Sequence, residues 1–207
     1  MAESRPIIFV VDDDPSVRDA IGNLLDSLGI RWQGFGSTED FFSAARPDAP
    51  SCLLLDVRLP GLNGLEFQDV LGKLGIHIPI VFITAHGDIP MTSRAMKAGA
   101  VDFLTKPFQK KALLDAIAEA LDRDKSARKA EAAISGLKAH IEQLTPRERE
   151  VMDLVVEGYM NKEIASRLGV SEITVKVHRG RVMEKMEADS LADLVRMAEK
   201  LKASALV

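Results

Sequence analysis

The chain has 207 residues, 46% of them hydrophobic and 28% charged, which indicates a globular protein longer than a typical single domain of about 100 to 150 residues. Its net charge is −4, but residues 162–185 carry six basic and three acidic residues, so that stretch alone favours an anionic partner. Cys52 is the only cysteine, and no run approaches the ~20 apolar residues of a membrane span, so we expect a cytoplasmic protein without a membrane partner.

Short apolar runs alternate with helical patterns through the first 121 residues. We predict strands at 7–11, 31–35, 52–56, 79–84 and 101–104, and helices at 15–28, 37–45, 64–73, 89–98 and from 109 onward. This order is (βα)5. Crossovers of this length predict a doubly wound parallel sheet with helices on both faces.

A charged stretch follows the first domain. Residues 122–141 are expected to form a mainly helical linker, which carries a short heptad-like series of Ala130, Ile134, Leu137, Ile141 and Leu144. Two heptads are too few to establish a coiled coil, so a solvated helix with one apolar edge and a dimer-forming signalling helix both remain open.

The remaining residues, 142–207, predict a small all-α domain of four helices. Thr145, Pro146 and Glu148 form a capping-box pattern that starts a helix at 146–157. Asn161 is expected to cap a second helix ending at Leu168. A third helix, capped by the segment that begins at Ser171, is expected to reach Met186, and a fourth, capped by Ser190, to run to about 203. Two short helices joined by a glycine-containing turn are typical of a helix-turn-helix, whose second helix enters the major groove of DNA.

Polar residues end several of the predicted strands. Asp12 and Asp13 follow the first strand, Asp56 closes the third, Thr84 closes the fourth, and Lys106 follows the fifth. Ligands bind at the carboxyl ends of parallel strands, so these side chains are expected to share one rim. Three carboxylates close together favour a hard cation with oxygen ligands, Mg²⁺ with Mn²⁺ as the alternative, and one of them could accept a phosphoryl group.

The identity of the nucleophilic aspartate separates two functions. Asp12 and Asp14, with Ser16, resemble the nucleophile loop of haloacid-dehalogenase-type phosphatases, and Mg²⁺-dependent phosphatase activity is therefore the enzymatic alternative. That resemblance fails at the later acidic motif, where Thr92 or Ser93 stands in place of the second acid, and it leaves Asp56 without a role.

A second resemblance covers nearly the whole chain. The acids at 12, 13 and 56, the segment Asp56–Gly64, Thr84 with Ala85, and Lys106 with Pro107 resemble the receiver domain of two-component response regulators over residues 5–121. The segments 84–91 and 96–100 resemble the FixJ type in particular, and residues from Leu144 to about 201 resemble LuxR-type DNA-binding domains of the FixJ/NarL family.

The resemblance implies a role for each residue of the rim. Asp56 would be the phosphoacceptor, and Asp13, Asp56 and the backbone carbonyl of Arg58 would bind Mg²⁺, with Asp12 acting through water. Thr84 and Phe103 would be the switch pair, Lys106 would pair with the phosphoryl oxygens, and the bond to Pro107 is expected to be cis. We also hypothesise that Arg58 and His86 control the access of water to the phosphoryl group.

The third helix of the second domain is expected to read DNA. Base contacts are expected from Lys176, Val177 and Arg179, and phosphate contacts from Lys162, Ser171, Thr174 and Arg181. The fourth helix carries an apolar series, which predicts a dimer contact suited to an inverted-repeat operator: Leu191, Leu194, Val195, Ala198 and Leu201.

Together these features predict a transcription regulator rather than an enzyme. A sensor histidine kinase would phosphorylate Asp56, and phosphorylation would favour a homodimer that binds promoter DNA and contacts RNA polymerase. A receiver that acts only through protein contacts, with a vestigial DNA-binding domain, is the third interpretation.

Overall fold

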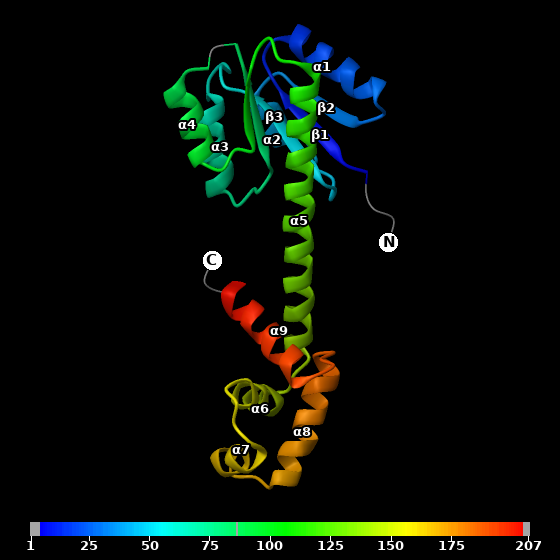
Figure 1. Cartoon of the computed structure of the whole chain (residues 1–207), viewed down its shortest axis with the longest axis vertical. Coiled ribbons are helices and arrows are strands. Elements are labelled where there is room, and N and C mark those ends of the chain that lie inside the picture. Colours follow the sequence, from blue (N-terminus) through cyan, green and yellow to red (C-terminus); the bar gives the residue numbers. More distant parts are fainter. Residues whose placement is uncertain (1–4, 86, 205–207) are drawn as a thin grey trace. The chain divides into compact units, whose positions relative to one another are not determined.

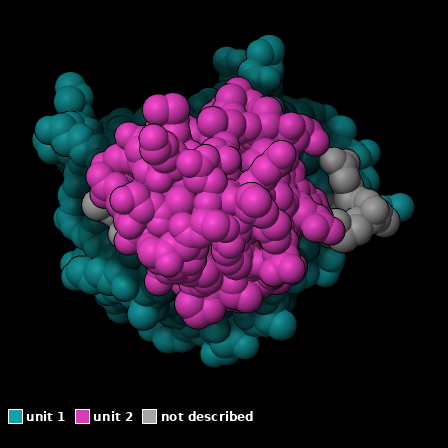
Figure 2. Space-filling model, turned by 90° about the horizontal axis from the view of Figure 1, so that it is seen from below, with its two compact units in different colours: residues 1–128 teal, residues 129–207 magenta. Residues whose placement is uncertain are grey.

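The computed structural model describes residues 5–85 and 87–204 (Figure 1). The chain divides into two compact units, residues 1–128 and 129–207, which are coloured separately in Figure 2. In the described part of the chain, no helix has the length and apolar character needed to cross a membrane.

Five parallel strands form the sheet of the first unit, in the order β2-β1-β3-β4-β5. The strands are β1 (Ile7–Val11), β2 (Arg31–Phe35), β3 (Ser51–Asp56), β4 (Ile80–Thr84) and β5 (Asp102–Thr105). The predicted parallel sheet is confirmed, and the predicted strand ends differ by one residue in β3, β4 and β5. The order changes direction between β1 and β3, which is where parallel α/β sheets bind ligands.

Five helices pack on the two faces of this sheet: α1 (Pro15–Ser27), α2 (Thr38–Ser43), α3 (Gly64–Lys73), α4 (Ile89–Lys97) and α5 (Lys110–Glu142). Alternate residues of β1 enter opposite cores, because side chains of a strand point to its two faces in turn. Phe9 belongs to the core that α2, α3 and α4 cover, whereas Val10 belongs to the core shared with α1 and α5.

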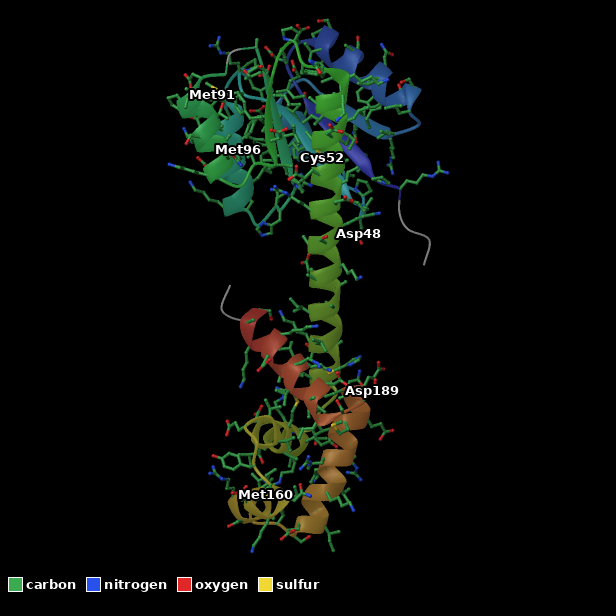
Figure 3. The ribbon with its side chains drawn as sticks, in the orientation of Figure 1. Asp48, Cys52, Met91, Met96, Met160 and Asp189 are labelled. Carbon is green, nitrogen blue, oxygen red and sulfur yellow. The ribbon has the colours of Figure 1, made fainter. Side chains whose placement is uncertain are left out.

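Cys52 on β3 is one of the fully buried residues of the second core (Figure 3). Burial raises the pKa of its thiol well above the ordinary value, which keeps the thiol protonated. Cys52 is therefore a small core residue, as its position in an apolar run indicates.

The last part of α5 in the first unit is anchored by a buried acid. The carboxylate of Asp124, only 3% exposed, accepts hydrogen bonds from the backbone N–H of Ser51 (2.8 Å) and from Nε of Arg128 (2.7 Å). Residues 122–141, expected to be a mainly helical linker, are helical throughout as part of α5. The charge-rich sequence around Asp124 gave no sign that one of its acids is buried.

The second unit contains α6 (Pro146–Val156), α7 (Asn161–Leu168), α8 (Glu172–Lys185) and α9 (Leu191–Ser204). Its buried core includes Met152, Ile164 and Val175. Gly169 ends α7 with a left-handed φ of 66°, a conformation that glycine adopts without steric cost, and this residue makes the turn into α8.

One expectation about the second unit was wrong, and another was wrong in part. The N-cap of α7 is Met160 (Figure 3), not Asn161, and Glu163 satisfies the backbone N–H of Met160 at 2.7 Å. On α9, Leu194 and Ala198 are buried in the core of their own unit, so they do not belong to an exposed dimer surface. Leu191 is exposed, at 44%, and Val195 and Leu201 are half-buried.

Candidate functional site

The register of the two central strands brings the acids together. Val11 of β1 is paired with Leu55 of β3, so Asp12 and Asp56 follow at the same level of neighbouring strands. One carboxylate oxygen each from Asp12, Asp13 and Asp56 lies within 4.8 Å of the others. Asp12 and Asp56 are buried, whereas Asp13 is exposed.

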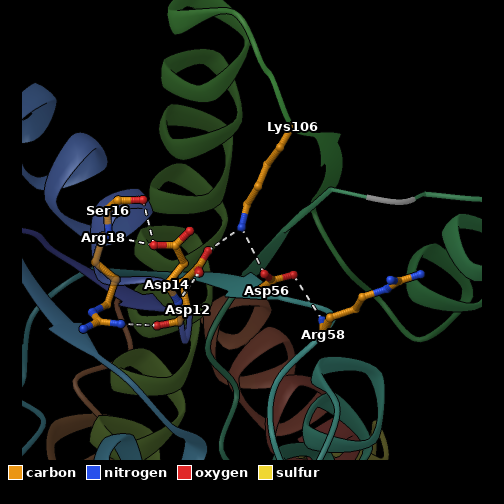
Figure 4. A network of polar contacts seen from close by, with 7 residues as sticks. All are labelled: Asp12, Asp14, Ser16, Arg18, Asp56, Arg58 and Lys106. Atoms are coloured by element: carbon orange, nitrogen blue, oxygen red, sulfur yellow. Dashed lines mark hydrogen bonds and ion pairs between the residues drawn. The ribbon is translucent and has the colours of Figure 1, made fainter.

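The ammonium group of Lys106 faces two of these acids (Figure 4). Its Nζ lies 2.6 Å from Oδ2 of Asp12 and 3.0 Å from Oδ2 of Asp56. Partial burial opposes the charge of Lys106, but the two carboxylates outweigh burial and raise its pKa. The backbone places this side chain, because the N–H of Lys106 donates to the carbonyl of Thr84 at 2.7 Å, and the bond to Pro107 is cis, as expected.

Backbone groups also bind the two buried carboxylates. The N–H of Asp14 donates to Asp12 at 3.0 Å, and the N–H of Arg58 donates to Asp56 at 3.1 Å. Burial raises the pKa of Asp12, although the bond from Lys106 partly offsets that rise. The side chain of Arg58 extends away from the carboxylates (Figure 4), so only its backbone lies at the rim.

The donor set fits a hard divalent cation. Three carboxylates converge within a few ångströms, and Mg²⁺ prefers oxygen ligands, commonly one or two carboxylates with water and phosphate oxygens. Lys106 supplies one positive charge against three acids, which leaves the cluster with an excess of negative charge. A cation bound there would offset that excess.

The predicted switch residues lie on the neighbouring strands β4 and β5. Thr84 is fully buried at the end of β4, and Phe103 is partly buried on β5, with its ring centre 6.0 Å from that of Phe82. A Cβ atom at Gly87 would lie 2.7 Å from the Phe103 ring, so this ring packs directly against the loop that follows Thr84. His86 lies outside the described residues.

Asp14 has a different role from the other acids at the end of β1. It caps α1 by accepting hydrogen bonds from the backbone N–H (2.8 Å) and the hydroxyl (2.7 Å) of Ser16. A dehalogenase-type phosphatase would need Asp14 at the reacting centre. The helix cap occupies this carboxylate instead, which disfavours the phosphatase interpretation.

The predicted DNA-contacting residues lie on α7 and α8 and at the turn between these helices. Most of these side chains are exposed, as a binding surface requires: Lys162, Ser171, Lys176, Val177 and Arg181. Thr174 is half-buried, and its hydroxyl lies 2.8 Å from that of Ser171. Arg179 is also half-buried, and its guanidinium group donates to Oδ1 of Asn161 at 2.7 Å. This hydrogen bond connects α8 to α7 and occupies one of the donors that Arg179 could offer to DNA.

Comparison with known proteins accounts for both units. The family model described as "Response regulator receiver domain" matches residues 8–118, and that described as "Bacterial regulatory proteins, luxR family" matches residues 142–198. The chain belongs to the two-component response regulators of the FixJ/NarL type. This response regulator thus combines a receiver with a LuxR-type DNA-binding domain, which implies phosphorylation-dependent control of transcription.

Relatives align with this chain along nearly its whole length. Nodulation protein W of Bradyrhizobium diazoefficiens is 55% identical over 204 residues, covering 99% of this chain and 90% of the relative. Transcriptional regulatory protein FixJ of Azorhizobium caulinodans is 42% identical over 198 residues, covering 96% and 93% of the two chains.

Two solved structures of response regulators also match nearly the whole chain. The response regulator StyR matches with a TM-score of 0.86 and 49% identity, covering 95% of this chain and 100% of StyR. Full-length FixJ from B. japonicum matches with a TM-score of 0.57 and 40% identity, covering 95% and 97%.

One exposed residue near the predicted DNA contacts was missed from the sequence. Ile173 is 76% exposed on α8, four positions before Val177. The spacing of four residues places both side chains on one side of a helix, and this signal was available in the sequence.

Proposed function

We propose that this response regulator is phosphorylated on Asp56 by a cognate sensor histidine kinase and that the phosphorylated form binds promoter DNA. The observation that carries the proposal is the convergence of Asp12, Asp13, Asp56 and Lys106 at one rim, in a chain that also carries a helix-turn-helix. In the transfer, an oxygen of Asp56 attacks phosphorus while the bond to the donor histidine nitrogen breaks.

Each residue of the rim has a part in this proposal. Asp13, Asp56 and the carbonyl of Arg58 would hold Mg²⁺, with Mn²⁺ as a substitute, and Asp12 would act through water. The bound cation would supply charge neutralisation for the phosphoryl oxygens. Lys106, already paired with Asp56, would move its ammonium onto a phosphoryl oxygen as the carboxylate becomes an acyl phosphate.

Phosphorylation of Asp56 would change the conformation of residues on β4 and β5. The Thr84 hydroxyl would donate to the phosphoryl group, and the Phe103 ring would follow, which changes the surface beside α4. That change would favour a homodimer that presents two copies of α8 to an inverted repeat and contacts RNA polymerase from the DNA. The protein would act in the cytoplasm, where promoter DNA lies.

Intact-protein mass spectrometry tests the first step. Acetyl phosphate with Mg²⁺ should add a single group of about 80 Da at Asp56, and a chelator should prevent the addition. Asp56→Asn should abolish the adduct, whereas Asp14→Asn, which changes a helix cap, should retain it. Sustained hydrolysis of phosphate esters, lost in Asp12→Asn, would instead identify a phosphatase and refute the proposal.

A further inference from the structure

Four residues at helical spacing share the exposed face of α8: Ile173, Lys176, Val177 and Gly180. Ile173 is 76% exposed and Val177 is 49% exposed, while Val175 and Val182 on the opposite face are buried in the core. Large aliphatic side chains at i and i+4 contact each other on a helix surface. The exposed face of α8 therefore carries an apolar pair with a lysine beside it.

This face is held in a fixed orientation by the contacts of α8. The Ser171 side chain caps the helix by accepting the Thr174 N–H at 3.1 Å, and Arg179 joins the helix to Asn161 of α7 at 2.7 Å. Gly180 has no neighbour within 4 Å of its Cβ position, so its lack of a side chain relieves no contact inside the unit. A glycine there leaves room for an approaching partner.

The charged residues around Ile173 and Val177 indicate which kind of partner this surface binds. Residues 162–185 carry six basic and three acidic residues, and Glu172, at the first position of α8, is the acidic residue nearest to Ile173 in the sequence. A basic surface attracts an anion. An apolar pair within that surface gains free energy when it is buried against an apolar group of the same partner. The thymine 5-methyl group is the apolar feature that base edges present in the major groove of DNA.

We propose that Ile173 is a specificity-determining residue that, together with Val177, contacts thymine methyl groups in the operator. The inference rests on the proposed function, in which α8 enters the major groove. It extends that function by assigning sequence preference to an aliphatic pair, whereas the neighbouring basic side chains contribute contacts to phosphates and guanine edges.

Selection from random duplex DNA, followed by base-analogue substitution, tests this inference. The full-length protein, phosphorylated with acetyl phosphate and Mg²⁺, selects a site, and deoxyuridine then replaces thymidine at one position at a time. Each contacted methyl should account for about three- to fivefold in wild-type affinity. Ile173→Ser should lose the preference for thymidine over deoxyuridine at the position that Ile173 contacts and keep it at the position that Val177 contacts, and Ile173→Val should partly restore the lost preference.

Leu74→Ser is the matched control, because Leu74 is also a strongly exposed aliphatic residue, at 61%, but lies in the receiver. It should keep the full wild-type dependence on thymine methyls. Wild-type affinity that is unchanged by deoxyuridine at every position, or an Ile173→Ser variant with the wild-type methyl dependence, would overturn the role of Ile173 while leaving DNA binding intact. Failure of the wild-type protein to enrich any sequence would overturn the proposed DNA-binding function itself, and the inference with it.

Discussion

The ammonium of Lys185, near the end of α8, lies 2.6 Å from a carboxylate oxygen of Glu148, 37 positions earlier and at the start of α6. The same carboxylate accepts the Thr145 N–H at 2.9 Å in a capping box. Lys185 also donates to the carbonyl of Gln143 at 3.1 Å. One buried acid therefore joins the start of α6 to the end of α8, the helix predicted to bind DNA.

Glu148→Gln is expected to destabilise the second unit in a pH-dependent way. The hydrogen bonds from Lys185 and Thr145 lower the pKa of Glu148 from 4.5 to about 2. A lowered carboxyl pKa contributes stability that is fully present above pH 4.5 and is lost as the pH falls through about 2. Glutamine keeps the capping box but not the ion pair, so the variant should lose about 1 to 2 kcal/mol at pH 7 and less as the pH approaches 2.

Urea unfolding of the full chain, followed by far-UV circular dichroism at pH 7 and pH 3, measures this loss. Glu150→Gln is the control, because its ion pair with Arg147 is solvent-exposed and should contribute less than about 0.5 kcal/mol. An equal loss of stability in the two variants at pH 7 would contradict the assignment.

Asp124→Ala is expected to destabilise the receiver by about 1 to 3 kcal/mol, because the buried N–H of Ser51 loses its hydrogen-bond acceptor. Asp124→Asn, which retains an acceptor oxygen, should recover part of that loss. Urea unfolding monitored by the fluorescence of Trp32, the only tryptophan, reports on this unit, and amide exchange at Ser51 should accelerate. Asp122→Ala, a change of an exposed acid in the same turn, should have little effect.

Gly64→Ala is expected to impair phosphorylation at Asp56. A Cβ atom at Gly64 would lie 2.3 Å from the carbonyl oxygen of Asp56 and 3.0 Å from Cα of Val57, so the backbone that carries the carboxylate would have to move. We expect about tenfold slower formation of the acetyl phosphate adduct. Gly72→Ala in the same helix meets no atom within 4 Å and should instead stabilise the receiver by about 0.5 to 1 kcal/mol at an unchanged rate.

Gly180→Ala should separate folding stability from DNA affinity. The substitution meets no neighbour within 4 Å inside the protein, so alanine should stabilise α8 by about 0.5 to 1 kcal/mol. If the exposed face of α8 lies against DNA, the added methyl should weaken binding by about tenfold, which corresponds to about 1.4 kcal/mol. Gly136→Ala in α5 also has open space and should leave DNA affinity unchanged; unaltered DNA binding by Gly180→Ala would argue against a close approach.

Lys106→Met should strengthen Mg²⁺ binding in the absence of phosphate. The ammonium, at 2.6 Å and 3.0 Å from two of the acids, competes with a cation for the same carboxylates. Removing a unit charge at about 4 Å in a water-like medium is worth ~1 kcal/mol, or about fivefold in affinity. Titration calorimetry measures the change, and Lys111→Met, which removes a solvent-exposed lysine, serves as control. Weaker binding by Lys106→Met would mean that the lysine supports the metal site.

The sequence predicted the sheet and the acidic rim because both depend on local patterns. Apolar runs that end in Asp12, Asp56 and Thr84 show where each strand stops, and parallel strands bring their carboxyl ends to one edge. The contacts that escaped prediction join residues far apart in the chain. The bond from Ser51 to Asp124 spans 73 positions and that from Lys185 to Glu148 spans 37, and no periodicity marks such pairs.

Errors in the second unit have a similar origin. Asn161 is a better N-cap residue than Met160 by intrinsic preference, but Glu163 accepts a hydrogen bond from the backbone N–H of Met160, and the helix begins one residue earlier than expected. The apolar series of α9 was taken as a dimer contact, because the sequence does not show that Leu194 and Ala198 pack in one core with residues of α6, α7 and α8.

The pairing of Val11 with Leu55 makes the acidic rim sensitive to the length of its strands. Successive side chains of a strand point to opposite faces, so inserting or deleting one residue within β1 or β3 would turn the following acid to the other side of the sheet. Loops between helices and strands carry no such restriction. Length variation among functional relatives should therefore be found in the loops, while the distance along the chain from the start of each central strand to its aspartate stays constant.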